Sequence, residues 1–518
     1  TSPAHVALLS TLPSHRRIVS VDLHDVAQRQ QTQPCTSNHA IEETQAAYLL
    51  YTSGTTGQPK GVVIEHGAWS RAIASQIDFF GFTRQTRMLQ FSNYTFDASI
   101  FEIFITLCSG GLLCIPSEHS RVNDLEGYIS QNELNTITLT PTVARVLRPE
   151  KLPHVKQCLF GGESLTQSDV KAWVQQGRRV TNCYGPTEAC VFTCGRDIKV
   201  EAIDTKSTNI GRPVGINAWI ISPMTGSICP IGAPGELCLE GHTLARGYHN
   251  DPEKTRLSFS TSLLDSIPGK KHGNRVYRTG DIVRYETDGT LDFLQRRDGQ
   301  IKLRGHRIDV GEIEHHIQHA MADDASFHSS TVQLYWRDRR GYGEPEIAAL
   351  LRMDMLHDET VHEVPCTLLS MTGKIPTSTK ASQLRYKLRR LLPEYMIPSI
   401  FIAVAHFPTT ASGKLDKEFA QGCIEDLLAR GQQEAEQDET WSITETCVRE
   451  WWSTILGVDA SLINRHENFF ALGGNSIHAI RLVGLARSNS YRLQYEDIFS
   501  SPILVDMVSH LLPIGHDD

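Results

Sequence analysis

Thr52-Ser53-Gly54-Thr55-Thr56-Gly57-Gln58-Pro59-Lys60-Gly61 separates two apolar runs, residues 46–51 and 62–64, and each run predicts a short buried strand. The glycines let backbone N–H groups converge on an anion, the hydroxyls add donors, and Lys60 adds a positive charge. The stretch therefore predicts a loop that holds a polyphosphate. The Walker A pattern is absent, because no Gly-Lys-Ser/Thr ending opens a helix here, and a P-loop NTPase is disfavoured. The alternative is an ordinary Gly/Thr hairpin loop without a ligand.

Length and composition limit the class of protein. At 518 residues and about 150 residues per domain, the chain predicts about two to four folded units. The net charge of −9 indicates no basic face for nucleic acid. The twelve cysteines lack paired C-x-x-C spacing, so we expect reduced thiols rather than a zinc site. No secretory leader or membrane-spanning run is visible, which predicts a soluble, cytoplasmic protein. The chain begins without methionine, so we expect a fragment or a processed product.

Strand and helix patterns alternate over residues 109–200, which predicts a mostly parallel sheet covered by helices. Two glycine corners follow strands in this region: Gly161-Gly162-Glu163 and Tyr184-Gly185-Pro186-Thr187-Glu188. Ligands of such sheets bind at the carboxyl ends of strands, so both corners are well placed. The second corner combines an aromatic face for a purine, a hydroxyl for a phosphate and a carboxylate able to hold Mg²⁺.

Two further carboxylates stand out. Asp97 lies within the apolar run 96–104, where a buried carboxylate is unfavourable unless a cation meets it; the alternative is a helix N-cap. From about residue 210 the pattern predicts a small β unit. Within it, Asp281 follows the strand-like run 277–280 and could simply cap a turn.

The last part of the chain predicts a separate helical unit. A charged linker, residues 431–439, precedes a capping box at Ser442 and Glu445. Apolar residues then follow at helical spacing: Ile443, Cys447, Val448, Trp451, Ile455 and Leu456. Farther on, glycines hold a turn open before a helix, and Ser476 lies at the positive end of that helix. The alternative for Ser476 is an ordinary N-cap.

These motifs, in this order, resemble an adenylation domain of the adenylate-forming superfamily followed by the peptidyl carrier domain of a non-ribosomal peptide synthetase. The resemblance runs from about Ala46 to Leu512. It implies an α/β fold: a large lobe of mostly parallel sheets with helices and a small β unit, a small α/β lobe, and an all-α four-helix carrier domain. The implied domains are a large lobe at 1–297, incomplete at its N-terminus, a small lobe at 298–428, a linker at 429–441 and a carrier at 442–518. Exposed apolar faces are expected where the large lobe is incomplete.

The resemblance also implies roles for single residues. Mg·ATP would be bound, with Lys414, Glu188 and Thr187 as catalytic residues, Glu188 holding the metal, and Asp298 acting as the hinge between lobes. Ser476 would carry 4′-phosphopantetheine. The implied nucleotide-binding residues are Thr52, Ser53, Gly54, Thr55, Thr56, Gly57, Lys60, Gly161, Gly162, Glu163, Tyr184, Asp281 and Arg296. Two departures from the family pattern are Gln295, where glycine is usual, and Asn475, where Asp or His is common.

The same resemblance implies an amino-acid substrate whose α-ammonium group binds Asp97. The implied pocket consists of Asp97, Ala98, Phe101, Thr138, Leu159, Gly161, Cys183, Val191 and Phe192, with Lys414 at the carboxylate. Because only Asp97 and Lys414 in this set are charged, we expect a hydrophobic L-α-amino acid. The implied reaction forms an aminoacyl adenylate and then a thioester on the chain's own carrier. Implied partners are a phosphopantetheinyl transferase and neighbouring synthetase domains such as condensation, with no nucleic acid and no membrane.

Three alternatives share parts of this pattern. An acyl-CoA synthetase-like ligase would share the phosphate loop and lysine, but would lack Asp97 and the carrier. A carrier scaffold with an inactive, truncated adenylation remnant would share every motif. A module of an amino-acid reductase or hybrid synthetase would look the same within these residues.

Overall fold

The structure is a computed structural model, and three parts of it are described here, each by itself: residues 40–297, residues 301–407 and residues 441–514. The described residues exclude 1–39, 54–58, 175–176, 199–207, 265–274, 298–300, 304–305, 336–345, 354–365, 371–379, 405–406, 408–421, 423–440, 461–462, 466, 471, 473, 475 and 515–518.

The first part is built on one long sheet. Five of its strands are parallel and lie in the order β4-β3-β5-β6-β7, as predicted for a helix-covered sheet. Their bounds are Leu112–Cys114, Arg87–Leu89, Thr136–Leu139, Gln157–Gly161 and Arg179–Tyr184. Parallel strands that are buried on both faces are typical of α/β folds. The carboxyl ends of β5, β6 and β7 therefore point to one edge of the sheet.

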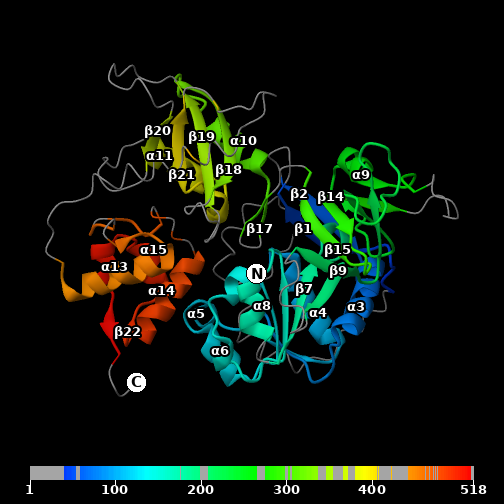
Figure 1. Cartoon of the computed structure of the whole chain (residues 1–518), viewed down its shortest axis with the longest axis horizontal. Helices are drawn as coiled ribbons and strands as arrows, with labels where there is room; N and C mark the ends of the chain where they lie inside the picture. The colour runs from blue at the N-terminus through cyan, green and yellow to red at the C-terminus, as the bar shows by residue number, and fades with distance from the viewer. Residues whose placement is uncertain are drawn as a thin grey trace. The chain divides into compact units, whose positions relative to one another are not determined.

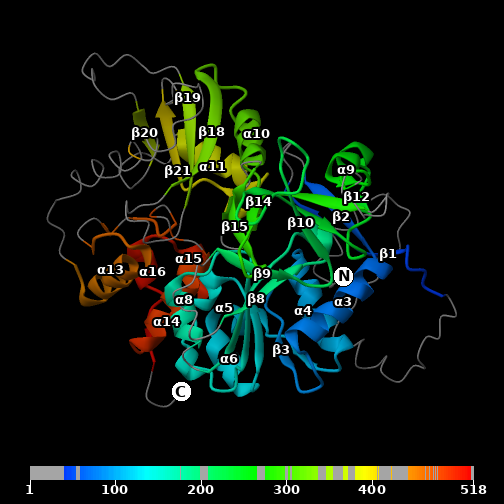
Figure 2. The same ribbon diagram turned by 45° about the vertical axis from the view of Figure 1, so that its right-hand side comes forward.

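The predicted small β unit is not separate from this sheet. The order continues from β7 through β8, β9, β15, β14 and β11 to β10, with antiparallel pairing throughout. Figure 2 shows β8 and β9 between the parallel strands and β14 and β15. The bounds are Cys194–Ile198 (β8), Asn209–Pro213 (β9), Asn217–Ile221 (β10), Gly235–Glu240 (β11), Val276–Tyr285 (β14) and Leu291–Arg296 (β15), and β13 (Phe259–Ser260) pairs with β14.

A second, antiparallel sheet carries the two strands that flank the phosphate loop. β1 (Ala46–Thr52) pairs with β2 (Lys60–Glu65), and β12 (Gly247–Tyr248) pairs with the other edge of β2. Thr52 lies opposite Lys60 in the register, so the two ends of the loop are held together. Both predicted strands form, but only β2 is buried as expected, because β1 exposes Leu49 (40%) and Tyr51 (58%).

Helices cover both faces of the parallel strands (Figures 1 and 2). On one face α3 and α4 contribute Trp69, Phe80 and Phe101 to a core, and on the other α6 and α8 contribute Ile129 and Trp173 to a second core. The bounds are His66–Phe80 (α3), Asp97–Cys108 (α4), Glu118–Asn123 (α5), Leu125–Gln131 (α6), Pro141–Ala144 (α7), Gln167–Val174 (α8) and Pro252–Ser258 (α9), with 3-10 turns at Pro149–Lys151 (η2) and Thr187–Ala189 (η3).

Residues 118–131 form two short helices rather than one. Asp124 adopts φ −152° and ψ 53°, which ends α5 and begins α6. A backbone in that conformation cannot continue an α-helix.

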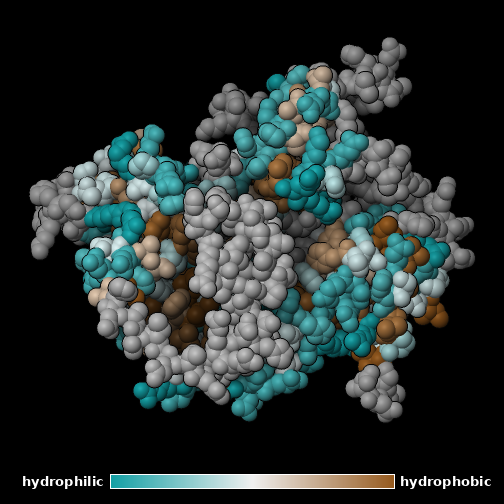
Figure 3. Space-filling view, turned by 180° about the vertical axis from the view of Figure 1, so that it is seen from behind, coloured by the Kyte–Doolittle hydropathy of each residue, from teal (hydrophilic) through white to brown (hydrophobic). Residues whose placement is uncertain are grey.

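Apolar surface is exposed on the first part. α4 exposes Phe104 (42%) and Leu107 (57%), and the edge strand β4 exposes Leu112 (47%). Seen from behind, apolar atoms gather in a hollow of the surface (Figure 3). The expectation that such faces arise from an incomplete large lobe stays a prediction.

The second part is a small α/β unit, as predicted. Its sheet has the order β18-β19-β21-β20. A β16–β17 hairpin precedes this sheet in the sequence. Strands β19 and β21 are parallel, and the other neighbours are antiparallel. The bounds are Ile301–Leu303 (β16), His306–Ile308 (β17), Val310–Ala320 (α10), Phe327–Tyr335 (β18), Glu346–Met353 (β19), Cys366–Ser370 (β20), Lys380–Arg389 (α11), Glu394–Met396 (η5) and Ile400–Val404 (β21).

The third part is helical, also as predicted. Helix α13 (Ile443–Leu456) begins with the expected capping box, in which Glu445 N donates to Ser442 Oγ and Ser442 N donates to Glu445 Oε2. The other helices are α14 (Ser476–Ser488), α15 (Tyr495–Ser500) and α16 (Leu504–Val508), with short strands at Tyr491–Arg492 (β22) and Leu512–Pro513 (β23). Ile443 fits the helical spacing but is 84% exposed, so it lies outside the buried face of α13.

Candidate active site

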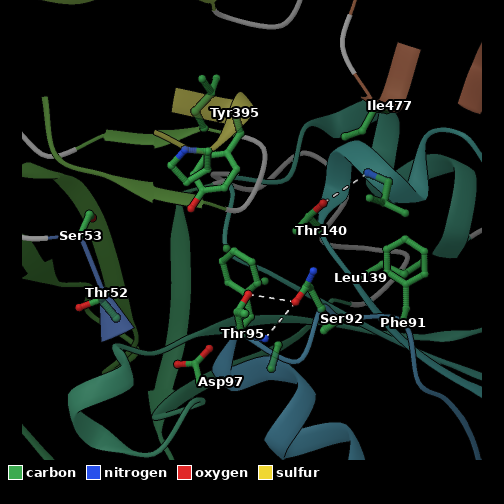
Figure 4. Close-up of a pocket in the computed structure, with 18 of the residues that line it drawn as sticks. Thr52, Ser53, Phe91, Ser92, Thr95, Asp97, Leu139, Thr140, Tyr395 and Ile477 are labelled. Atoms are coloured by element: carbon green, nitrogen blue, oxygen red, sulfur yellow. Dashed lines mark hydrogen bonds between the residues drawn. The ribbon is translucent and has the colours of Figure 1, made fainter. Parts of the chain in front are cut away.

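Residues of the first part line a cavity at the carboxyl edge of the parallel strands. Figure 4 shows Asp97 pointing into it from the start of α4, with Thr52, Thr95 and Ser92 around the same space. Many residues predicted for the site line this cavity: Thr52, Ser53, Asp97, Ala98, Thr138, Gly161, Gly162, Tyr184, Thr187, Val191, Phe192, Asp281 and Arg296. They come from β1, α4, β5, β6, β7, η3, β14, β15 and the loops between them. Residues far apart in the sequence therefore form one site.

Asp97 is the first residue of α4, and its carboxylate does not cap the helix. The N-cap is Phe96, which has no side-chain cap bond, so the N-cap alternative for Asp97 is wrong. Instead, Thr187 Oγ1 donates to Asp97 Oδ2 at 2.7 Å. A carboxylate at a helix N-terminus is stabilised by the helix dipole. Asp97 is therefore positioned to meet a cation in the cavity.

The neighbour of Thr187 takes part in a buried ion pair. Glu188 is fully buried in η3, and its Oε1 lies 2.7 Å from Lys60 Nζ. Tyr248 OH donates to the same Oε1 at 2.9 Å and accepts from Lys60 Nζ at 3.0 Å. The three side chains come from β2, η3 and β12. Lys60 of the phosphate loop and Glu188 of the Tyr184–Glu188 corner are thus paired. The sequence motifs did not predict this pairing.

Glu188 is a chemically suitable ligand for Mg²⁺, which prefers carboxylate oxygens and completes its shell with water and substrate phosphates. In this structure Glu188 Oε1 is engaged by Lys60 and Tyr248. A divalent cation at Glu188 would therefore compete with the ammonium of Lys60 for the same carboxylate oxygen. The metal-binding role of Glu188 stays a prediction.

Tyr184, Asp281 and Arg296 form a second polar group in the cavity. Tyr184 OH donates to Asp281 Oδ2, and Arg296 Nη1 donates to Asp281 Oδ1 at 2.9 Å. Burial, with the nearby charge of Asp281, holds the pKa of Tyr184 well above its ordinary value. Asp281 lies inside β14 rather than after a strand, so it does not cap a turn. A carboxylate fixed in this way suits a pair of hydroxyl groups such as those of a ribose.

The first glycine corner is fixed by close packing. A Cβ on Gly161 would lie 3.0 Å from Phe192 Cε1 and 3.1 Å from Cys183 O, and Gly162 has φ 84°. Glu163 accepts hydrogen bonds from the backbone N of Thr142, at 3.1 Å, and from its hydroxyl. Glu163 thus anchors the start of α7, while Gly161 and Gly162 line the cavity.

The predicted substrate pocket divides into two layers. Asp97, Ala98, Thr138, Gly161, Val191 and Phe192 line the cavity, whereas Phe101, Leu159 and Cys183 lie behind them in the core. Phe101 packs edge-on against Phe192, with ring centroids 4.8 Å apart. Burial holds the pKa of the Cys183 thiol well above its ordinary value. The inner three residues therefore support the wall rather than form it.

Several predicted residues fall outside the described residues: Gly54, Thr55, Thr56, Gly57, Asp298 and Lys414. Ser476 is described in its backbone and begins α14, so a phosphodiester on it would lie at a helix N-terminus, which favours an anion. Among the described residues, no group of three or more His, Cys, Asp or Glu side chains could hold a metal. The nine cysteines whose side chains are described are free thiols, as expected.

Sequence reasoning missed Glu102, Gln76 and Tyr248. Glu102 is fully buried and accepts from Ser92 Oγ at 2.7 Å and from the backbone N of Phe91 at 3.1 Å. Burial raises the pKa of Glu102 to about 8, although these donors act in the opposite direction. The available signal was a second carboxylate in the apolar run 96–104, which holds Glu102 as well as Asp97.

Comparison with known proteins agrees with the site. Residues 3–249 match the family of AMP-binding enzymes, and residues 448–511 match the phosphopantetheine attachment site. The chain is 73% identical over 511 residues to apicidin F synthase of Gibberella fujikuroi and 44% identical over 529 residues to HC-toxin synthetase of Cochliobolus carbonum. Each alignment covers 99% of this chain, and the chain spans about 10% of the length of each relative.

Solved structures show the same architecture. The fold matches holo-PA1221, an NRPS protein containing adenylation and PCP domains, with a TM-score of 0.70 and 25% identity over 97% of this chain and 79% of that one. It also matches the Vibrio cholerae adenylation domain AlmE in complex with glycyl-adenosine-5′-phosphate, with a TM-score of 0.60 and 25% identity over 76% of this chain and 68% of that one.

The AMP-binding match and the fold together give the chain the architecture of the adenylate-forming class. It carries an AMP-binding domain followed by a phosphopantetheine attachment domain, and the proteins it resembles include non-ribosomal peptide synthetases.

Proposed function

We propose that this chain activates a hydrophobic L-α-amino acid as its aminoacyl adenylate and transfers it to its own carrier domain, in non-ribosomal peptide biosynthesis. The observation that carries the proposal is that Asp97 and Thr187 line one cavity and are hydrogen-bonded to each other, while Glu188 follows Thr187 directly in η3. A carboxylate for the α-ammonium group and a carboxylate suited to Mg²⁺ are thus connected through a single threonine.

In the first step, a carboxylate oxygen of the amino acid attacks the α-phosphorus of ATP, a new O–P bond forms, and the bond to the β-phosphate breaks to release pyrophosphate. Asp97 orients the amino acid through its ammonium group. Asp281, fixed by Tyr184 and Arg296, orients the ribose. Lys60 neutralises phosphate charge when it leaves Glu188. Catalysis of this kind relies on positioning and charge stabilisation.

In the second step, Ser476 would hold 4′-phosphopantetheine, whose thiol would take the acyl group from the adenylate, lose its proton to solvent and leave AMP as the released product. Lys414 and Asp298, which lie outside the described residues, keep their proposed roles at the substrate carboxylate and at the hinge. We further propose a phosphopantetheinyl transferase and neighbouring synthetase domains as partners and a cytoplasmic location. None of the described helices has both the length and the hydropathy needed to cross a membrane.

Substrate choice rests on the outer layer of the pocket. Ala98, Thr138, Val191 and Phe192 offer an uncharged surface, on which an ionised substrate side chain would be buried without a partner. The relatives' names do not specify which amino acid this module activates.

The experiment is amino-acid-dependent ATP–pyrophosphate exchange over a panel of amino acids, with Lys414→Ala as the inactive control. Mass spectrometry of Ser476 after treatment with a phosphopantetheinyl transferase and CoA tests the carrier separately. Exchange with one hydrophobic amino acid supports the proposal. A modified Ser476 without any exchange would instead favour a carrier with an inactive adenylation remnant.

Preferred exchange with an acid that lacks an amino group would favour the acyl-CoA synthetase-like alternative. That outcome would leave Asp97 without the role proposed for it.

A further inference from the structure

A strained turn forms part of the substrate wall. Cys190 and Val191 have φ values of 63° and 72°, a region that non-glycine residues rarely occupy, and Val191 is β-branched as well. The backbone N of Phe192 donates to Cys190 O at 3.1 Å, which closes a three-residue γ-turn centred on Val191. A γ-turn with positive φ at its centre is the rare, strained form. Such a turn persists only when its surroundings hold it.

Gln76 is the side chain that holds this turn from one side. It is 1% exposed on α3, and its Nε2 donates to Cys190 O and to Phe192 O, each at 2.8 Å. Both amide hydrogens are thus used on the two carbonyls that flank Val191. The opposite orientation of the amide would place its oxygen against two carbonyl oxygens, so the donor assignment follows from the partners.

Gly185 closes the turn from the other side. A Cβ at this position would lie 1.8 Å from Val191 O, so only glycine fits. The turn is therefore clamped between α3 and the Tyr184–Glu188 corner. Because Val191 and Phe192 line the cavity, the position of this turn determines the shape of the pocket.

We propose that Gln76 is a positioning residue for amino-acid selectivity: it holds the strained Cys190–Phe192 turn that forms the wall of the substrate pocket. This inference rests on the proposed function. Without the two Gln76 bonds the strain is no longer balanced, the turn relaxes, and Val191 and Phe192 no longer define one side-chain shape. Gln76 itself does not line the cavity.

The test compares Gln76→Met, which keeps the volume and removes both donors, with a matched control, Gln157→Met. Gln157 Nε2 donates to Phe80 O at the end of the same helix, and Gln157 begins β6 while Gly161 ends it at the cavity. ATP–pyrophosphate exchange is measured over the amino-acid panel, with separate KM values for amino acid and for Mg·ATP.

For Gln76→Met we expect the amino-acid KM to rise roughly tenfold and the preference for the best substrate over its nearest rival to fall by a similar factor, as loss of about two buried hydrogen bonds implies. The KM for Mg·ATP should change less than about twofold. Gln157→Met should retain the selectivity of the unaltered chain. If Gln76→Met does not fold, Gln76→Asn, which keeps an amide too short to reach both carbonyls, is tested for the same loss.

Unchanged selectivity in the folded Gln76 variant, or equal rises of both KM values, would overturn the inference while leaving the proposed function intact. Absence of exchange in the unaltered chain would overturn the proposed function, and this inference with it.

Discussion

Thr187 Oγ1 donates a 2.7 Å hydrogen bond to Asp97 Oδ2, although the two residues lie 90 positions apart in the sequence. The bond joins the residue proposed to hold the substrate's ammonium group to the corner that carries Glu188. It also restricts the rotation of the Asp97 carboxylate. The bond therefore links the position of the Asp97 carboxylate to that of the corner that carries Glu188.

Removal of this bond should raise the KM for the amino acid more than the KM for Mg·ATP. For Thr187→Val, which keeps the shape and removes the hydroxyl, we expect the amino-acid KM to rise about fivefold to tenfold, the effect of about one hydrogen bond to a charged group. Pyrophosphate exchange measures it. Thr187→Ser restores the donor and serves as the control, and a Val variant with an unchanged amino-acid KM would contradict the account.

The Lys60–Glu188 pair should show strong coupling in stability. Either Lys60→Met or Glu188→Gln alone leaves a buried group without its main partner, and we expect each to lower the free energy of unfolding by about 3 kcal/mol. The double variant should lose clearly less than the sum of the two. Urea unfolding of the four proteins without Mg²⁺ measures the coupling, and additive losses would show that the pair contributes no interaction energy.

The raised pKa of Glu102 predicts that the stability of the chain depends on pH. Its pKa is raised from 4.5 to about 8 in the folded chain, chiefly by burial. Between these values the unfolded chain has released the proton and the folded chain has kept it, so stability falls as pH rises. Below about pH 4.5 both states are protonated and this effect vanishes.

In Glu102→Gln, which cannot ionise, this slope should disappear, so the variant should gain stability relative to the unaltered chain between about pH 5 and pH 8. Urea unfolding at the two pH values gives the comparison. Parallel pH profiles of the two proteins would contradict the assignment to Glu102.

Local motifs predicted much of the fold and part of the site. The apolar runs beside the phosphate loop became β1 and β2, and the Ser442–Glu445 capping box began α13, because hydrophobic pattern and capping act over a few residues. The break at Asp124 and the continuity of β9 with β15 were missed. Neither feature produces a hydrophobic pattern that can be recognised within one helical turn or within one strand.

Long-range contacts explain what else was missed. Gln76 and Cys190 are 114 positions apart, and Lys60 and Tyr248 are 188 apart, so no spacing rule connects them. The γ-turn at Val191 was also hidden, because a valine gives no sign of a positive φ. Motifs name the residues that meet the ligand, whereas the residues that hold those motifs in place become visible only in the folded chain.

The most direct test of the central claim is ATP–pyrophosphate exchange by the unaltered chain and by Asp97→Asn, with the best amino acid and with its deaminated analogue. Loss of the carboxylate charge should lower kcat/KM for the amino acid roughly a hundredfold and leave the analogue nearly unaffected. Equal effects on the two substrates, or no effect on either, would contradict the claim that Asp97 binds the ammonium group of an amino acid.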